Sequence, residues 1–210
     1  MTISTYAQLQ TAVSNWMHRA DLTSYIADFI KQGESILNRK LRTVDMETVG
    51  TLTANPASRF LSLPTGFAEM QSLWCESPRE EIFYVSPAQI SEAITTAGGL
   101  PHFFTVKSNI EFDRLPGSAY SLECRYFKSY DIASDLTNTL LTNYPEIYLH
   151  AALAGASLFV VDDARLATFR TLLNEEIDEL NKSEERKRGS GLAMLRTELS
   201  DTGFDIITGA

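Results

Sequence analysis

The chain has 210 residues, of which 44% are hydrophobic and 21% charged, so it holds enough apolar material for a core and is unlike a disordered chain. Its formal net charge of −9 argues against tight binding along a nucleic acid, which requires a basic stripe of Lys and Arg. The length suits one domain, or one helical domain with a sizeable insertion. We expect no signal peptide, because the N-terminus lacks a charged region followed by an apolar one. We expect no membrane span, because the longest apolar stretch, around 151–161, is far shorter than the ~20 residues that a span needs.

Two amphipathic helices are predicted at the start of the chain. Residues 5–18 carry one apolar stripe with Thr5 or Ser4 as cap, and a second helix over 22–41 follows the cap Asp21. The short link between them implies a helical hairpin. In the helix predicted over 22–41, the apolar pattern places Glu34 on the side that faces solvent. The first stripe consists of Tyr6, Leu9, Val13, Trp16 and Met17.

The periodicity changes after Asp45. Apolar residues now alternate with other residues, and single prolines separate the runs. Residues 47–138 are therefore predicted as a β-rich region. Ser86 followed by Pro87 predicts one short helix through about Thr95. The same region holds six basic and eleven acidic residues, so it carries much of the acidity. The later strand-like runs are 103–107, 109–112 and 120–127.

The two cysteines, Cys75 and Cys124, both lie in these strand-like apolar runs. Two cysteines can form one disulfide, but nothing else in the sequence suggests secretion. We interpret them as reduced thiols in a core.

Helical periodicity returns near Asn143. Residues 144–161 are almost wholly apolar, which predicts a buried helix, and a further helix is predicted over about 164–188. Gly189, Ser190 and Gly191 are expected to end it. The predicted class is therefore α+β: a mainly helical bundle formed by both chain ends (1–46 and 139–188), a β-rich insertion (47–138) with one short helix, and an extended C-terminal tail (189–210).

Groups that could carry chemistry are sparse. The three histidines are far apart and belong to no metal-binding pattern, so His18 is interpreted as a helix-end residue and His150 as a helix contact. The carboxylate pairs at 162–163 and 175–176 are adjacent on helices, where neighbours do not face each other. We predict no catalytic, cofactor-binding or metal-binding residue, no cofactor and no enzyme activity.

The order of several motifs resembles that of tailed-phage head-to-tail connector (adaptor) proteins over roughly residues 1–185. The opening helical hairpin, a strand–turn–strand and two later segments carry the resemblance. These are Thr5–Leu9, Trp16–Leu22, Phe29–Ile30 and Glu34–Arg42; Leu63–Phe67 with Met70 and Leu73; Gly98–Phe104; and Leu140–Leu153.

The resemblance implies a structural virion protein without a cofactor, located at the neck and made in the host cytoplasm. Such adaptors dock as a ring under the portal, commonly a dodecamer, extend the DNA channel and offer an attachment face for the tail. The implied partners are the portal protein, further copies of the chain, tail or other neck proteins, and DNA that passes without sequence-specific binding. The alternatives are a virion-associated enzyme, wall-degrading or nucleic-acid-processing, and a generic monomeric binding module.

Two hypotheses connect residues to this role. The tail is apolar, isolated by glycine, and too short for its own core, so we expect it to dock on the portal or on a neighbouring subunit. The acidic surface is expected to line part of the channel, where like charge would let DNA slide. The candidate docking residues are Leu192, Met194, Leu195, Leu199, Phe204, Ile206 and Ile207.

Overall fold

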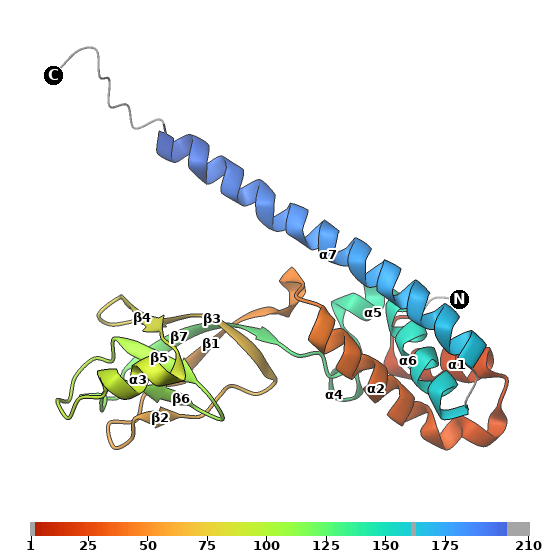
Figure 1. The fold of residues 1–210 in the computed structure, drawn as a ribbon, viewed down its shortest axis with the longest axis horizontal. Coiled ribbons are helices and arrows are strands. Elements are labelled where there is room, and N and C mark those ends of the chain that lie inside the picture. Colours follow the sequence, from red (N-terminus) through yellow and green to blue (C-terminus); the bar gives the residue numbers. More distant parts are fainter. Residues whose placement is uncertain (1–2, 161–162, 201–210) are drawn as a thin grey trace, which may run out of the picture. The chain divides into compact units, whose positions relative to one another are not determined.

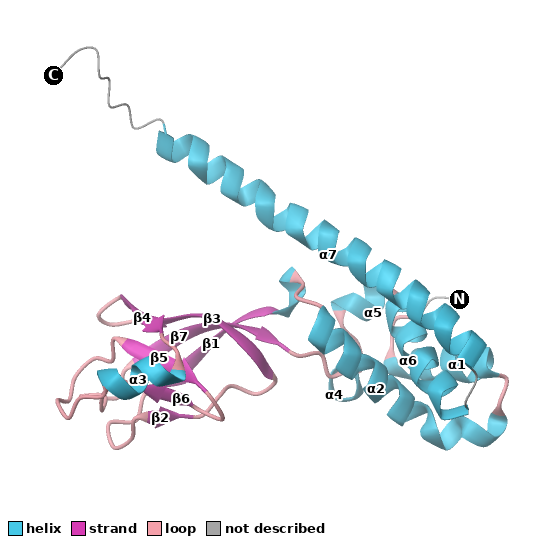
Figure 2. Ribbon diagram, in the orientation of Figure 1, coloured by secondary structure: helices cyan, strands magenta, loops and turns pink. Residues whose placement is uncertain are grey.

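The computed structural model describes residues 3–160 and 163–200, and these form two compact units (Figure 1). The first unit comprises the described residues of Met1–Thr43 and Leu141–Ala210, and the second is Val44–Leu140. Figure 2 shows that the first unit is built from helices and that the strands belong to the second.

The helical unit begins with α1 (Tyr6–Met17). Thr5 caps it by accepting a hydrogen bond from the backbone N–H of Gln8, which satisfies one donor that has no partner inside the helix. His18 ends the helix in the left-handed conformation, at φ 50°. The next segment is a 3₁₀ helix, η1 (Ala20–Tyr25), which leads directly into α2 (Ile26–Lys40). The helix predicted over 22–41 thus has its first turns in the tighter 3₁₀ form.

Helix α6 (Pro145–Val160) contacts α1, α2 and α7, and it follows the short α5 (Thr139–Asn143). Its crossing with α2 is close because Gly33 has no side chain: a β-carbon there would lie 2.7 Å from the backbone carbon of Ala151. The prediction of a buried helix is confirmed for Ile147, Tyr148 and Ala151, each at most 1% exposed, whereas Leu158 and Phe159 near the helix end are more than half exposed.

Glu34 is not on the solvated side, as its helical pattern suggested, but is 7% exposed. The hydroxyl of Tyr148 on α6 donates a hydrogen bond of 3.0 Å to its carboxylate. A carboxylate can be buried when hydrogen bonds replace its water, and the helical pattern alone cannot reveal that partner 114 positions away.

Helix α7 is a single helix over Asp163–Ser200, 38 residues long. Gly189 and Gly191 therefore do not end it, and the tail expected to be extended from 189 is helical as far as Ser200. Glycine costs only about 1 kcal/mol inside a helix, and the residues that follow are mostly good helix formers such as Leu, Ala and Met.

The second unit is a seven-stranded sheet with the order β1-β7-β3-β4-β5-β6-β2. The pair β4–β5 is parallel and the other neighbours are antiparallel. The strands are β1 (Glu47–Thr53), β2 (Phe60–Leu61), β3 (Phe67–Cys75), β4 (Glu80–Tyr84), β5 (Phe103–Val106), β6 (Ile110–Phe112) and β7 (Ser121–Lys128). The short helices of this region are η2 (Val44–Met46), α3 (Pro87–Ala93) and α4 (Ile132–Asp135).

Strand β7 lies between β1 and β3 and shows the predicted alternation. Leu122, Cys124 and Tyr126 are buried in the core of the sheet, whereas Arg125 between them is exposed. Helix α3 also begins as predicted, with a capping box in which Ser86 and Gln89 bond each other's backbone N–H groups.

The predicted fold class is wrong. The described strands form one curled sheet, a half-barrel, accompanied by helices, rather than a helical bundle of both chain ends with an insertion and an extended tail. One physical reason is helix length. α7 is about 57 Å long, while α1, α2 and α6 have 12, 15 and 16 residues and span about 18–24 Å, so these short helices cannot match it along its length.

Candidate interaction site

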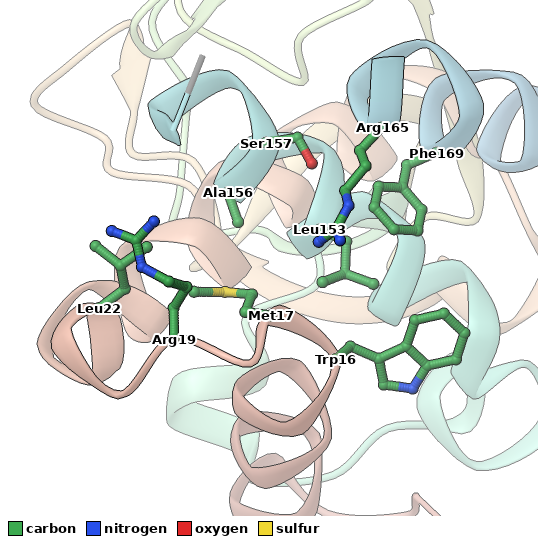
Figure 3. A pocket seen from close by; sticks show the side chains of 9 residues that line it. All are labelled: Trp16, Met17, Arg19, Leu22, Leu153, Ala156, Ser157, Arg165 and Phe169. Carbon is green, nitrogen blue, oxygen red and sulfur yellow. The ribbon is translucent and has the colours of Figure 1, made fainter. Parts of the chain in front are cut away.

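The helical unit contains a pocket of about 260 Å³ (Figure 3). Its apolar lining comes from Met17 on α1, Leu22 on η1, and Leu153 and Ala156 on α6, which are all 9% exposed or less. Met17 and Leu22 flank the link between α1 and η1, in which His18 adopts the left-handed conformation, and α6 packs against α1. Ser157 is the one neutral polar residue in the lining.

The remaining lining residues are aromatic or basic: Trp16, Phe169, Arg19 and Arg165. The nine described lining residues thus include two guanidinium groups and no carboxylate. Arg19 also forms two hydrogen bonds with Asp21, of 2.8 and 2.7 Å, and these hold the pKa of that exposed carboxyl below its usual value. The pocket therefore combines an apolar lining with two guanidinium groups, of which that of Arg19 is paired with Asp21.

The aromatic residues of the pocket are held by His150. Its ring packs edge-on against Trp16, with centroids 6.5 Å apart, and parallel to Phe169, with centroids 6.1 Å apart. Its Nδ1 lies 2.9 Å from a carboxylate oxygen of Glu176 on α7. The interpretation of His150 as a helix contact is confirmed, and so is that of His18 as a helix-end residue.

Sequence reasoning missed this pocket because it assigned Trp16 and Met17 alike to a buried stripe. Met17 is 9% exposed, but Trp16 is 53% exposed. Periodicity identifies the face of a helix that turns inward, yet it does not show whether neighbouring helices close over the whole face. The sequence feature that could have indicated the pocket is Trp16, which lies next to the link that contains Arg19.

The candidate docking residues divide into two sets. Leu192, Met194, Leu195 and Leu199 lie within α7, and Phe204, Ile206 and Ile207 lie outside the described residues. No group of three or more His, Cys, Asp or Glu side chains in the described part of the chain could hold a metal ion. Among the same residues, no helix is long and apolar enough to cross a membrane.

Cys75 and Cys124 are buried, free cysteines in the core of the sheet, which confirms the interpretation as core thiols. They lie on the paired strands β3 and β7, where Cys75 is opposite Leu122 and Leu73 is opposite Cys124. Burial raises the pKa of the Cys124 thiol, so it stays neutral and unreactive.

The sheet unit exposes aromatic side chains along the β4–β5 pair. Phe83 and Phe103 are register partners and are 56% and 37% exposed, while Tyr84 is 61% exposed. Exposed aromatic residues are enriched where proteins bind one another, so this strand pair is a second candidate contact surface.

Comparison with protein families matches residues 4–195 to the family described as SU10 adaptor protein. The match spans the helical unit and the sheet unit, from before α1 into the last turns of α7. Comparison with curated proteins finds no match.

Proposed function

Because the chain belongs to the SU10 adaptor protein family and is therefore a structural adaptor of a bacteriophage, we propose that it is a head-to-tail connector subunit that docks as a ring under the portal. The family match over residues 4–195 is the observation that carries this function. The ring extends the DNA channel and provides the face to which the tail or further neck proteins attach.

A ring needs two different complementary surfaces on each copy, because a head-to-tail contact closes only when one surface meets another. The chain offers chemically distinct surfaces. The helical unit has the pocket with an apolar lining and two arginines, and the sheet unit has the exposed aromatic residues Phe83, Tyr84 and Phe103. By analogy with other connector rings, we expect twelve copies of the chain in the ring.

The charge of the chain suits a wall that DNA passes without sticking. The net charge is −9, and a surface of like charge repels phosphates instead of binding them. The helical unit also has a cavity of about 230 Å³ whose lining includes Glu146, Glu176 and Glu179. Acidic side chains of this kind are the candidates for the surface that faces the channel.

The C-terminal residues are the proposed docking arm, and they bind the portal or a neighbouring copy. Their apolar composition supports this role. Leu192, Met194, Leu195 and Leu199 lie on α7, and Phe204, Ile206 and Ile207 follow within a few residues. Burying such apolar residues on a partner is favourable by about 25 cal/mol per Å² of apolar area.

The test is cryo-electron microscopy of the neck of the virus particle. We expect a ring directly beneath the portal, into which both compact units of the chain fit as separate bodies. Fitting the units separately avoids any assumption about their arrangement. A neck without this ring, or density for the chain at another part of the particle, would contradict the connector role.

A further inference from the structure

The pocket between α1, η1, α6 and α7 has the size of a socket for a side chain. Its volume of about 260 Å³ is below the ~300–1,000 Å³ of pockets that bind small molecules. At its edge stands Trp16, more than half exposed, and tryptophan and arginine are the residues that most often dominate the energy of protein contacts. The apolar lining of the pocket suits a large apolar side chain, and its two arginines suit a segment that carries negative charge.

Residues 201–210 of the chain have this chemistry. Their sequence is Asp-Thr-Gly-Phe-Asp-Ile-Ile-Thr-Gly-Ala, in which Phe204 lies between Asp201 and Asp205 and no Lys or Arg occurs. The two aspartates complement Arg19 and Arg165 in the lining of the pocket. Phe204 is the largest apolar side chain in the segment and has two rotatable bonds, so ordering it costs little entropy.

The segment cannot reach the pocket of its own chain. Phe169 lines the pocket, and α7 continues without a break from there to Ser200, 31 positions later (Figure 1). At ~1.5 Å per residue, that part of the helix is about 46 Å long. Ten further residues span at most about 36 Å even when fully extended. Residues 201–210 can therefore occupy this pocket only from another copy.

We propose that the pocket receives residues 201–210 of a second copy of the chain, with Phe204 against its apolar lining and the aspartates beside Arg19 and Arg165. The contact is head-to-tail, because the start of α7 in one copy binds the segment after α7 in the next. This inference rests on the proposed ring for its setting, and it specifies one of the ring's contacts. It also chooses the neighbouring copy over the portal as the partner of the last ten residues.

The test uses a synthetic peptide of residues 200–210 and the full-length chain carrying Trp74→Phe, which leaves Trp16 as the single tryptophan. The peptide is titrated to about 1 mM, the weak end of specific binding, while tryptophan emission is recorded. We expect a saturable change in emission because Trp16 lines the pocket. A peptide with Phe204→Ala should bind at least tenfold more weakly.

Charge substitutions locate the binding site. Arg165→Glu in the chain should weaken the native peptide at least tenfold, and a peptide with both Asp201→Lys and Asp205→Lys should bind this variant better than it binds the native chain. Arg170→Glu is the matched control, because Arg170 is exposed on the same helix and is not among the lining residues. It should leave the affinity unchanged. Circular dichroism verifies that each variant is folded.

Several outcomes overturn the proposal. These are no saturable change in Trp16 emission, equal affinity for the Phe204→Ala peptide, or an Arg165→Glu variant that binds as the native chain does. A change in Trp16 emission on adding the purified portal protein, with none on adding the peptide, assigns the pocket to the portal instead. None of these results bears on whether a ring lies in the neck, so failure here and failure of the connector role are distinguishable.

Discussion

The hydrogen bond between Tyr148 and Glu34 joins α6 to α2 inside the helical unit. Both side chains are buried, at 1% and 7% exposed, and their oxygens are 3.0 Å apart. Removing the donor leaves a buried side-chain oxygen of Glu34 with one partner fewer, and water cannot replace the lost bond inside the unit. The stability of the helical unit should therefore depend on this pair of residues.

Tyr148→Phe should lower the free energy of unfolding by about 1–3 kcal/mol, the usual cost of removing the hydrogen-bond partner of a buried polar group. Urea denaturation measures the change. Tyr25→Phe is the control in the same unit, because Tyr25 is 44% exposed and its ring packing on Phe159 survives the substitution. Equal effects of the two substitutions would show that the buried bond contributes nothing.

Cys124 should react slowly with iodoacetamide. The nucleophile is the thiolate, and a pKa raised by burial means that less thiolate exists at pH 8 in the folded chain than in the unfolded chain. A variant with Cys75→Ala leaves Cys124 as the single thiol, and mass spectrometry follows its modification. We expect fast modification only after unfolding in urea. Modification at the same rate with and without urea would refute the buried thiol.

Helices α2 and α6 cross closely because Gly33 on α2 has no side chain. At Gly33 the obstacle to a β-carbon is backbone, at 2.7 Å, whereas at Gly155 it is the oxygen at the end of the flexible Gln32 side chain, at 2.8 Å. Backbone cannot move aside without shifting a helix, but a glutamine side chain can rotate. The two glycines therefore differ in what they tolerate.

Gly33→Ala should destabilise the helical unit by up to about 2 kcal/mol, because overpacking costs about 1–3 kcal/mol and helix propensity returns only about 1 kcal/mol. Gly155→Ala, the matched substitution in α6, should be nearly neutral or stabilising. Thermal unfolding followed by circular dichroism compares the two. The reverse order of stabilities would show that the close crossing does not control this position.

Helix α7 offers a test of its own length. Gly191→Ala should stabilise the helix locally by about 1 kcal/mol, because alanine is the better helix former and the position is helical. Hydrogen exchange of the amides around residues 189–200 reports this local stability. If exchange there is as fast as in an unstructured peptide, with or without the substitution, the helix ends earlier.

At the scale of the whole molecule, assembly is expected to depend on the residues beyond α7. Deleting residues 201–210 should leave both compact units folded, because the described fold is complete without them, but it should prevent attachment in the neck. Circular dichroism checks the fold, and microscopy of particles assembled with the truncated chain checks attachment. Normal attachment would show that residues 201–210 do not belong to the docking arm.

Local patterns predicted many of the elements. The capped start of α1, the capping box of α3 and the alternation of β7 follow from neighbouring residues, so they are visible in the sequence. The burial of Glu34, the exposure of Trp16 and the continuation of α7 past Gly189 were not predicted. The first two depend on partners far away in the chain, and the third depends on a small cost of glycine that the surrounding helix formers exceed.

The adaptor family, the acidic balance and the alternation between helical and strand-forming segments are visible in the amino-acid sequence, because each depends on the identity and spacing of neighbouring residues. The joining of seven strands in one curled sheet, and the pocket in which two arginines and two aromatic rings lie with Met17 and Leu153, become visible only in the folded chain. Strand order and pocket formation depend on contacts between distant segments. Many pairings satisfy the same local pattern, and only packing selects one of them.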